Sequence, residues 1–274
     1  MTPESVNYSF VRFAEQSFYR QVNQALVNSC AIKPGQHIVD LACGTGAVTQ
    51  LILQKLQGMR ESLVIAIDSS AEALQQARAK LAEARNQMVK LVQGQAEQLS
   101  GLVRERVDAV ILCNAIHMMA QKEEIAAEAL RILRPGGVFA FNTTFFAGAQ
   151  PEETAIFYRR WMYRAIRTLR SRYQLMPDKA AKVESRRQLS STEYVELLHS
   201  QGFTLREELI KPVAVPLEGW LGISQFQDFI AGALPGVPLE AGRQALQQAV
   251  TQVFAELKLQ FVPRNWLFIV AARP

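Results

Sequence analysis

The stretch Ile38-Val39-Asp40-Leu41-Ala42-Cys43-Gly44-Thr45-Gly46-Ala47-Val48-Thr49 decides how the rest of the chain is interpreted. A short apolar run that ends in an acid, followed by small residues and a helical pattern, predicts a buried strand, a tight turn and a helix start. Gly44 and Gly46 carry no Cβ, so the backbone can approach a ligand closely and adopt positive φ. The helix expected over residues 47–57 would direct unpaired backbone N–H groups to the same place. The stretch therefore predicts a ligand site at the end of the first strand.

The residues around this stretch alternate between apolar runs and amphipathic segments. We predict strands at 37–41, 63–68, 89–93, 108–113 and 138–144, with helices at 47–57, 71–86 and 122–133 between them. Parallel strands that are buried on both faces form continuous apolar runs, as residues 63–67 and 109–113 do. The alternation predicts an α/β fold with a doubly wound parallel sheet, and right-handed crossovers bring the carboxyl ends of its strands to one edge.

Asp68 ends the second predicted strand, 24 residues after Gly44. A carboxylate at this place can accept hydrogen bonds from both ribose hydroxyls of an adenosine. The alternative is that Asp68 caps the helix that begins near Ala71, a task for which Ser69 or Ser70 is better suited. Enzymes that bind NAD also place a carboxylate at this position. Asp68 therefore predicts an adenosine-containing ligand but does not show which cofactor it is.

The spacing of the glycines bears on that choice. A dinucleotide fingerprint is Gly-x-Gly-x-x-Gly, and Thr49 stands at the third glycine position here. The pattern Asp40-x-Ala42-x-Gly44-x-Gly46 instead resembles the first motif of class I S-adenosylmethionine-dependent methyltransferases, in the Ala-Cys-Gly-Thr-Gly variant of several small-molecule enzymes. This resemblance implies a Rossmann-like seven-stranded sheet whose last strand is antiparallel, a helical cap inserted after the fifth strand, and S-adenosyl-L-methionine as cofactor.

Two further segments resemble motifs of that family, in the expected order. Residues 94–99, Gly-Gln-Ala-Glu-Gln-Leu, are similar to Gly-Asp-Ala-Glu-x-Leu, which implies adenine contacts from the Gln95 side chain and the Ala96 backbone N–H. Residues 133–137, Leu-Arg-Pro-Gly-Gly, match the signature Leu-x-Pro-Gly-Gly, in which the proline stops a helix and the glycines permit a tight turn. The resemblance covers residues 36–145 strongly.

The end of the fourth predicted strand carries two candidate residues. In the resembled family this stretch lies under the transferred methyl group, which implies that the Asn114 amide holds the cofactor's amino-acid end or a substrate atom. His117 is one of three histidines, and a neutral imidazole here can take a proton from a hydroxyl or amine during methylation. A purely structural histidine stays open as the alternative. The cofactor-binding residues that we predict are Asp40, Ala42, Cys43, Gly44, Thr45, Gly46, Asp68, Ser69, Gln95, Ala96 and Asn114.

Composition limits the class of protein further. With 274 residues and 49% hydrophobic content, the chain can bury one large core with an inserted cap. Its three cysteines are widely spaced and lack a Cys-x-x-Cys pair, so we expect neither a disulfide framework nor a metal site. No run approaches 18 consecutive apolar residues, and the first residues lack the layout of a secretion signal, so we expect a cytoplasmic protein.

We divide the chain into four parts. These are an N-terminal helical lid (1–35), a cofactor-binding core (36–145), a helical substrate cap (146–190) and the C-terminal part of the core (191–274), which includes a second helical excursion at about 219–259. The resemblance implies that lid and cap close over the acceptor. The predicted acceptor-binding residues are Tyr8, Phe10, Phe157 and Trp161, with aromatic packing inside the protein as the alternative.

The predicted helix at 152–173 is rich in arginine and holds the positive excess of a chain whose formal charge is +5. Its basic side could meet an anionic acceptor, an acyl carrier protein or an anionic membrane surface, and solvated arginines are the alternative. We do not expect nucleic acid as a partner, because interleaved stacking aromatics and an added binding module are missing from the sequence.

These observations predict a methyltransferase that acts on a small, partly hydrophobic metabolite. Direct displacement at a sulfonium needs alignment of the reactants and exclusion of water, which agrees with a sequence that shows no nucleophile triad. Two alternatives stay open. One is an NAD(P)-dependent oxidoreductase on the same architecture, and the other is a non-catalytic S-adenosylmethionine-binding protein that acts through its basic helix.

Overall fold

The structure is a computed structural model that describes residues 10–56, 61–82, 88–178, 180 and 188–274. The first half contains α1 (Val11–Ala14), α2 (Ser17–Ser29), β1 (His37–Leu41), α3 (Ala47–Leu56), β2 (Leu63–Asp68), α4 (Ala71–Leu81), β3 (Met88–Gln93), η2 (Ala96–Gln98), α5 (Leu99–Leu102), β4 (Val107–Cys113), η3 (Ile116–Met118), α6 (Lys122–Ile132) and β5 (Leu133–Thr143). The second half contains η4 (Glu152–Thr154), α7 (Ala155–Thr168), the π-helical turn η5 (Leu169–Tyr173), α8 (Ser191–Ser200), β6 (Thr204–Pro216), α9 (Leu217–Ile223), α10 (Gln227–Ala233), α11 (Leu239–Glu256) and β7 (Phe261–Ala272).

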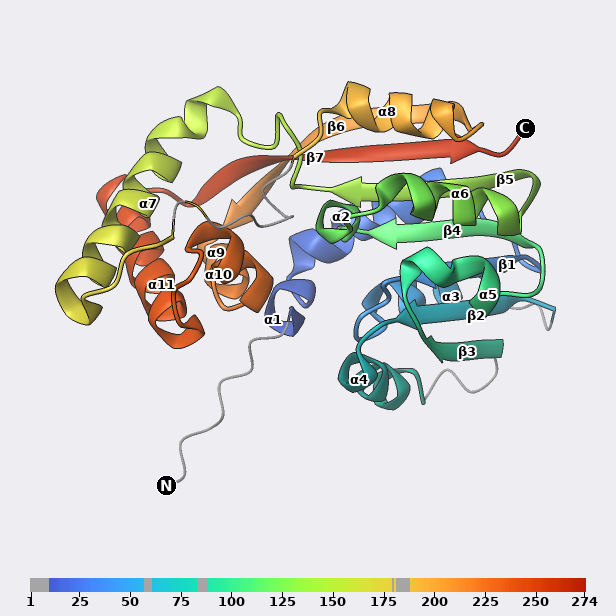
Figure 1. Ribbon diagram of the computed structural model, residues 1–274, viewed down its shortest axis with the longest axis horizontal. Helices are drawn as coiled ribbons and strands as arrows, with labels where there is room; N and C mark the ends of the chain where they lie inside the picture. Colours follow the sequence, from blue (N-terminus) through green and yellow to red (C-terminus); the bar gives the residue numbers. More distant parts are fainter. Residues whose placement is uncertain (1–9, 57–60, 83–87, 179, 181–187) are drawn as a thin grey trace. The chain divides into compact units, whose positions relative to one another are not determined.

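The strands form one seven-stranded sheet in the order β3-β2-β1-β4-β5-β7-β6 (Figure 1). The pairs β1–β2, β2–β3, β1–β4 and β4–β5 are parallel, and β7 runs antiparallel to β5. The order reverses at β1, so right-handed crossovers place the helices after β1 and β2 on one face and α6 on the other. This arrangement confirms the predicted doubly wound fold with an antiparallel last strand.

The central strands follow from their sequence, because β1, β2 and β4 are buried almost without interruption. Such strands can only sit inside a sheet that is covered on both faces. β5 differs from the expectation at one end, since it begins at Leu133 and not at residue 138. Leu133 pairs with Val107, and the next pair is Val138 with Ala109. The register shifts between these two pairs, and this shift accommodates the extra residues of β5.

The Pro-Gly-Gly turn at the start of β5 is fixed by close backbone contacts. Gly136 has φ +76°, and a Cβ on Gly137 would lie 2.9 Å from the carbonyl oxygen of Arg134 and 3.0 Å from that of Asp108. The Arg134 guanidinium also donates to both oxygens of the Asp108 carboxylate at 2.8 and 2.7 Å. The turn therefore requires its glycines for structural reasons.

Two compact units make up the chain. Unit 1 consists of residues 1–19, 148–188 and 212–265, and unit 2 consists of residues 20–147, 189–211 and 266–274. Unit 2 contains the parallel part of the sheet and all of the predicted cofactor-binding residues. The predicted lid is shared between the units, and the proposed roles of lid and cap stay predictions.

Unit 1 has an aromatic interior. Phe157 and Trp161 of α7 contact Trp220 of α9 at ring-centroid distances of 5.1 and 5.2 Å, and Phe254 of α11 packs edge-on against Phe157. The Trp161 indole N–H also donates to the carbonyl oxygen of Leu246 at 2.9 Å. These contacts join three helices from distant parts of the sequence.

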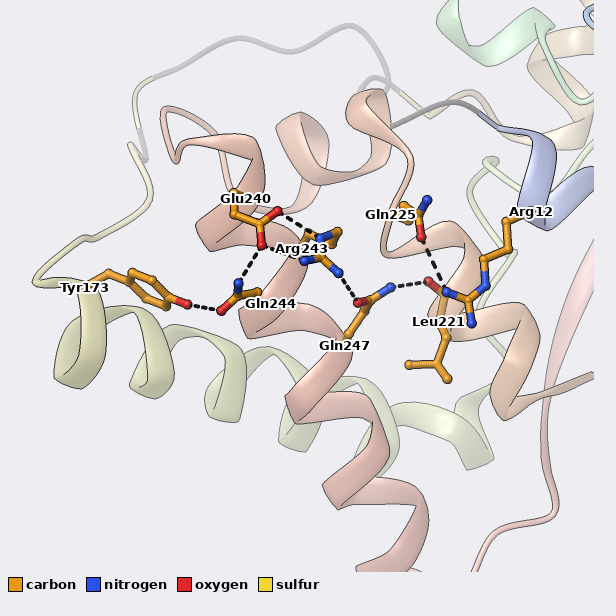
Figure 2. A network of polar contacts seen from close by, with 8 residues as sticks. All are labelled: Arg12, Tyr173, Leu221, Gln225, Glu240, Arg243, Gln244 and Gln247. Atoms are coloured by element: carbon orange, nitrogen blue, oxygen red, sulfur yellow. Dashed lines mark hydrogen bonds and ion pairs between the residues drawn. The ribbon is translucent and has the colours of Figure 1, made fainter. Parts of the chain in front are cut away.

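A polar network holds the outer parts of unit 1 together (Figure 2). The Tyr173 hydroxyl donates to Oε1 of Gln244, whose Nε2 donates to Oε1 of Glu240. Arg243 links Glu240 to Gln247, and Gln247 donates to the carbonyl oxygen of Leu221 at 3.0 Å. The network connects η5, α11 and α9.

Two kinds of feature are absent from the described residues. None of the helices there is both long and apolar enough to cross a membrane. In the same part of the chain, no three or more His, Cys, Asp or Glu side chains are grouped so that they could hold a metal ion.

Candidate functional site

The register of the parallel strands brings the predicted site residues to one edge of the sheet. Leu41 at the end of β1 pairs with both Ile67 and Leu112, and Asp68 pairs with Gln93. The turns that follow β1, β2, β3 and β4 therefore start at the same edge, which is where open α/β sheets bind ligands.

The glycine turn after β1 is wound tightly. Ala42, Gly44 and Gly46 have φ values of +55°, +54° and +81°. The Cys43 N–H donates to the carbonyl oxygen of Ile67 at 2.9 Å, and the Gly46 N–H donates to that of Cys43 at 2.9 Å. The turn is thus fixed against β2, and it ends at the first turn of α3.

The two glycines of the turn differ in their surroundings. A Cβ on Gly46 would lie 3.2 Å from Cδ1 of Leu81 and 3.4 Å from Cβ of Ala77, so this glycine is needed for close packing on α4. No atom lies within 4 Å of the place where a Cβ on Gly44 would stand. The backbone at Gly44 is therefore open to a ligand, while Gly46 has a structural task.

Asp68 connects the glycine turn to the start of α4. Its Oδ2 accepts from the Gly44 N–H at 2.8 Å, and its Oδ1 accepts from the Ser70 N–H at 2.9 Å. Ser70 is the N-cap of α4, since its hydroxyl oxygen accepts from the Ala73 N–H. The capping alternative for Asp68 is therefore not needed, and the carboxylate lies beside the open backbone of Gly44.

Asp40 is buried under the turn, with 1% of its surface exposed. Its Oδ2 accepts from the Thr49 hydroxyl at 2.6 Å. Burial raises the pKa of the Asp40 carboxyl to about 7, and the Asp68 carboxylate adds to the increase, although the Thr49 hydrogen bond opposes it. Thr49 thus donates a hydrogen bond to Asp40 at the position where a dinucleotide fingerprint has its third glycine.

The third turn of the edge contains Gly94, Gln95 and Ala96. The Gly94 N–H donates to the Asp68 carbonyl oxygen at 3.1 Å, which ties this turn to the end of β2. Gln95 is exposed and precedes η2, while Ala96 is buried. The arrangement leaves the Gln95 side chain at the surface of the edge, and its contact with adenine stays a prediction.

Asn114 follows β4 with φ +49° and is 5% exposed. Its backbone N–H donates to both the carbonyl oxygen and Oδ1 of Asn142 at 2.9 Å, and its own Oδ1 accepts from the Thr144 N–H at 3.1 Å. Asn142 in turn donates to Oδ1 of Asn23 at 3.1 Å. This chain of amides holds the backbone of Asn114 in a left-handed conformation at the ligand edge.

His117 lies in η3 and is 4% exposed. Its ring stacks on Phe145 with centroids 4.3 Å apart, and Nδ1 lies 3.1 Å from the Thr143 hydroxyl oxygen. That oxygen also accepts from the Phe145 N–H at 3.0 Å. When Nδ1 carries the proton and donates to Thr143, Nε2 is the basic nitrogen that a base requires; when the Thr143 hydroxyl donates to Nδ1, the proton stands on Nε2.

Phe10, Phe157 and Trp161, three of the four predicted acceptor-binding residues, belong to unit 1. Tyr8 lies outside the described residues. Phe10 packs on Phe13 and Phe226 at centroid distances of 5.0 and 5.2 Å. Phe157 and Trp161 are only 3% and 1% exposed and belong to the aromatic interior, so packing is their observed role and contact with an acceptor stays a prediction.

Sequence reasoning missed three residues that support the site. Thr49 holds Asp40, Thr143 orients His117, and Asn142 fixes the backbone of Asn114. Thr49 left a local signal, because it lies nine residues after Asp40 in the first turn of the following helix. Thr143 and Asn142 left none, since their contacts depend on the register between β4 and β5.

Comparisons with known proteins agree with this arrangement. Residues 38–137 match the family described as methyltransferase domain. An uncharacterised methyltransferase of Synechocystis sp. is 34% identical over 120 residues, which are 43% of this chain and 51% of that protein. A trans-aconitate 2-methyltransferase of Acidovorax ebreus is 28% identical over 248 residues, 87% of each protein. The chain spans about half the length of the first curated relatives that it matches.

Solved structures share the fold. The mycolic acid cyclopropane synthase CmaA1, whose crystal structure contains S-adenosylhomocysteine, superposes with a TM-score of 0.58, over 93% of this chain and 84% of that one. Its sequence is 12% identical, so the likeness concerns the fold alone.

The raised pKa of Asp40 predicts a pH dependence of stability. The carboxyl remains protonated up to about pH 7 in the folded protein, whereas its ordinary pKa is 3.8. Between these values the folded state binds the extra proton, so the free energy of unfolding falls as the pH rises from 4 to 7, by up to about 4 kcal/mol. Urea unfolding across this range should show the loss.

The Asp40→Asn variant is the matched control, because an amide oxygen can still accept from Thr49. We expect this variant to lose the Asp40 part of the pH dependence. An identical pH profile for variant and wild type would show that Asp40 titrates normally in the folded protein.

Proposed function

We propose that the whole protein transfers a methyl group from S-adenosylmethionine to a small, partly hydrophobic metabolite, since residues 38–137 match the methyltransferase domain family. The observation that carries the proposal is the alignment of four strand ends at one edge of the sheet. This edge collects the glycine turn, Asp68, Gln95 and Asn114.

The charge of the edge favours this cofactor over a dinucleotide. Asp40 and Asp68 are both acidic, and the predicted cofactor-binding residues include no lysine or arginine. The Asp40 carboxyl loses its proton more easily when a positive charge is bound nearby. S-adenosylmethionine brings a sulfonium and an ammonium group, whereas NAD brings a pyrophosphate. The relatives named above lend no support to the oxidoreductase alternative.

We assign the parts of the cofactor by the chemistry of each turn. Asp68 would accept from the ribose hydroxyls, and Gln95 with the Ala96 N–H would contact the adenine. The open backbone at Gly44, together with Ala42, Cys43, Thr45 and Ser69, would line the nucleoside part. The side-chain nitrogen Nδ2 of Asn114 has no hydrogen-bond partner among the described residues, and it would contact the amino-acid end or the acceptor.

Transfer from a sulfonium is a direct displacement, so the protein chiefly aligns the acceptor and excludes water. Where the acceptor atom carries a proton, His117 would take it through Nε2. Thr143 supports this role, because it engages Nδ1 and thereby fixes the orientation of the ring.

The high content of apolar and aromatic residues in the predicted cap and second excursion supports a partly hydrophobic acceptor. The similarity to a trans-aconitate 2-methyltransferase over most of the chain supports a small acceptor and is compatible with an anionic one. A carrier-protein-tethered acceptor and a cytoplasmic location remain parts of the proposal.

The proposal is tested by methyl transfer from isotopically labelled S-adenosylmethionine into an extract of the source cells. The extract is then separated into solvent-soluble, protein and nucleic-acid fractions. We expect label in the solvent-soluble fraction, or in the protein fraction only where the acceptor is bound to a carrier. Label in nucleic acid would contradict the proposed acceptor class. Cofactor binding without any transfer would favour the non-catalytic alternative.

Asp68→Asn should weaken the binding of S-adenosylhomocysteine by about 1.5–3 kcal/mol, since hydrogen bonds to a charged group are lost while one acceptor oxygen remains for the backbone. Isothermal titration calorimetry measures the difference. Glu72→Gln removes the same charge from the exposed first turn of α4 and should bind like the wild type. Equal affinity of the wild type and a folded Asp68→Asn variant would remove Asp68 from the site.

His117→Gln should lower turnover of the acceptor that the labelling identifies by roughly 10²–10⁴-fold, the usual contribution of a general base. Calorimetry should give the same affinity for S-adenosylhomocysteine as the wild type, because the predicted role concerns proton transfer alone. Turnover at the wild-type rate would assign His117 to structure.

A further inference from the structure

The outer face of α7 and η5 carries a continuous stripe of exposed residues. They follow one another at spacings of three, four and seven residues, which place them on one side of a helix. We call this set the arginine stripe, and it consists of Ile156, Arg159, Arg160, Tyr163, Arg167 and Arg170. All six are exposed, and the 14 residues of α7 extend over about 21 Å.

The charge of the chain is concentrated in this segment. Residues 154–177 contain six arginines and neither Asp nor Glu, whereas the formal charge of the entire chain is only +5. The remainder of the protein is therefore close to neutral. A field that arises from one helix attracts anions to that helix and not to the protein at large.

The six arginines fall into two groups by their contacts with the described residues. Arg160 and Arg164 both pair with Glu256 of α11, and Arg172 lies over the ring of Tyr173. Arg159, Arg167 and Arg170 make no hydrogen bond or ion pair with any described residue. These three side chains stand on the stripe and keep their full charge toward solvent.

Apolar side chains interrupt the arginines on the same stripe. Ile156 is 49% exposed and Tyr163 is 66% exposed, and Met176 just beyond η5 is 55% exposed. The opposite face of α7 is packed, so these exposed side chains belong to its outer face. Its inner residues Phe157 and Trp161 are almost fully buried.

The stripe is held in place from its inner side. The Trp161 indole donates to Leu246 of α11, Arg164 pairs with Glu256 at 2.5 Å, and the Tyr173 hydroxyl donates to Gln244 (Figure 2). These contacts fix α7 and η5 to α11 at several points along their length. The helix therefore presents its outer face as a preformed surface.

We propose that the arginine stripe docks the protein onto the surface of an anionic lipid membrane. The arginines would contact the lipid phosphates, while Ile156 and Tyr163 enter the boundary between headgroups and acyl chains. This docking goes beyond the proposed methyl transfer and does not depend on it.

The shape of the stripe favours a membrane over a protein partner. A protein groove that receives a helix contacts a broad apolar face. The broad apolar face of α7 is already used inside unit 1, and what remains outside is one narrow row of charged and apolar side chains. A flat anionic surface can contact such a row along its whole length.

The test measures co-sedimentation of the intact protein with phosphatidylcholine vesicles that contain or lack phosphatidylglycerol, at low and high ionic strength. We expect binding only to the anionic vesicles, and release by salt, because screening weakens contacts between exposed charges. The triple variant Arg159→Gln, Arg167→Gln, Arg170→Gln should bind on the order of 100-fold more weakly, from the usual contribution of an arginine near an anionic surface. Ile156→Gln with Tyr163→Gln should also weaken binding.

The matched control removes three charges elsewhere. Arg20, Arg78 and Lys80 are exposed and have no partner among the described residues, so their replacement by Gln gives the same net charge with the stripe intact. This control should bind anionic vesicles like the wild type. Thermal unfolding verifies that all variants are folded. The release by salt is measured on the wild-type protein, so it does not depend on the folding of any variant.

Two results would overturn the proposal. One is the absence of wild-type binding to anionic vesicles at low ionic strength, in which case an acidic protein becomes the better candidate for the stripe. The other is an equal loss of binding in the control and the stripe variant, since net charge would then explain the adsorption.

Discussion

The chain changes the direction in which it crosses the sheet at β1, which lies between β2 and β4. Crossovers from β1 and β2 go to one face, and the crossover from β4 goes to the other, so the chain leaves the carboxyl ends of β1 and β4 in opposite directions. The open backbone of Gly44 and the strained backbone of Asn114 lie at these two ends. The position of the candidate site is thus a consequence of strand order.

The residues at this candidate site lower the stability of the folded protein. A buried Asp40 close to the Asp68 carboxylate disfavours its own ionisation, and Ala42 and Asn114 hold left-handed conformations that side chains rarely adopt. Such departures from local preference cluster at functional sites, where the surrounding structure maintains them. Here the hydrogen bond from Thr49 and the contacts of Asn142 with Asn114 maintain them. A cationic ligand at the edge would relieve the repulsion between the two acids.

The sequence was sufficient for the sheet, because its strands are continuous apolar runs and its turns contain glycine, proline or a capping serine such as Ser70. Family motifs supplied the candidate site. The pairing of Leu133 with Val107 and the contact of Thr143 with His117 could not be predicted, since both depend on the register of β4 and β5. The set of segments that forms unit 1 could not be predicted either, because its three segments lie far apart in the sequence.

The edge formed by the glycine turn and the turn after β3 is the proposed binding site of S-adenosylmethionine. Hydrogen–deuterium exchange with and without S-adenosylhomocysteine tests it most directly, with NAD as the comparison. We expect slower exchange of backbone amides in residues 42–46 and 94–96 with S-adenosylhomocysteine and no such change with NAD. Protection of these residues by NAD alone, or protection by S-adenosylhomocysteine confined to other parts of the chain, would contradict it.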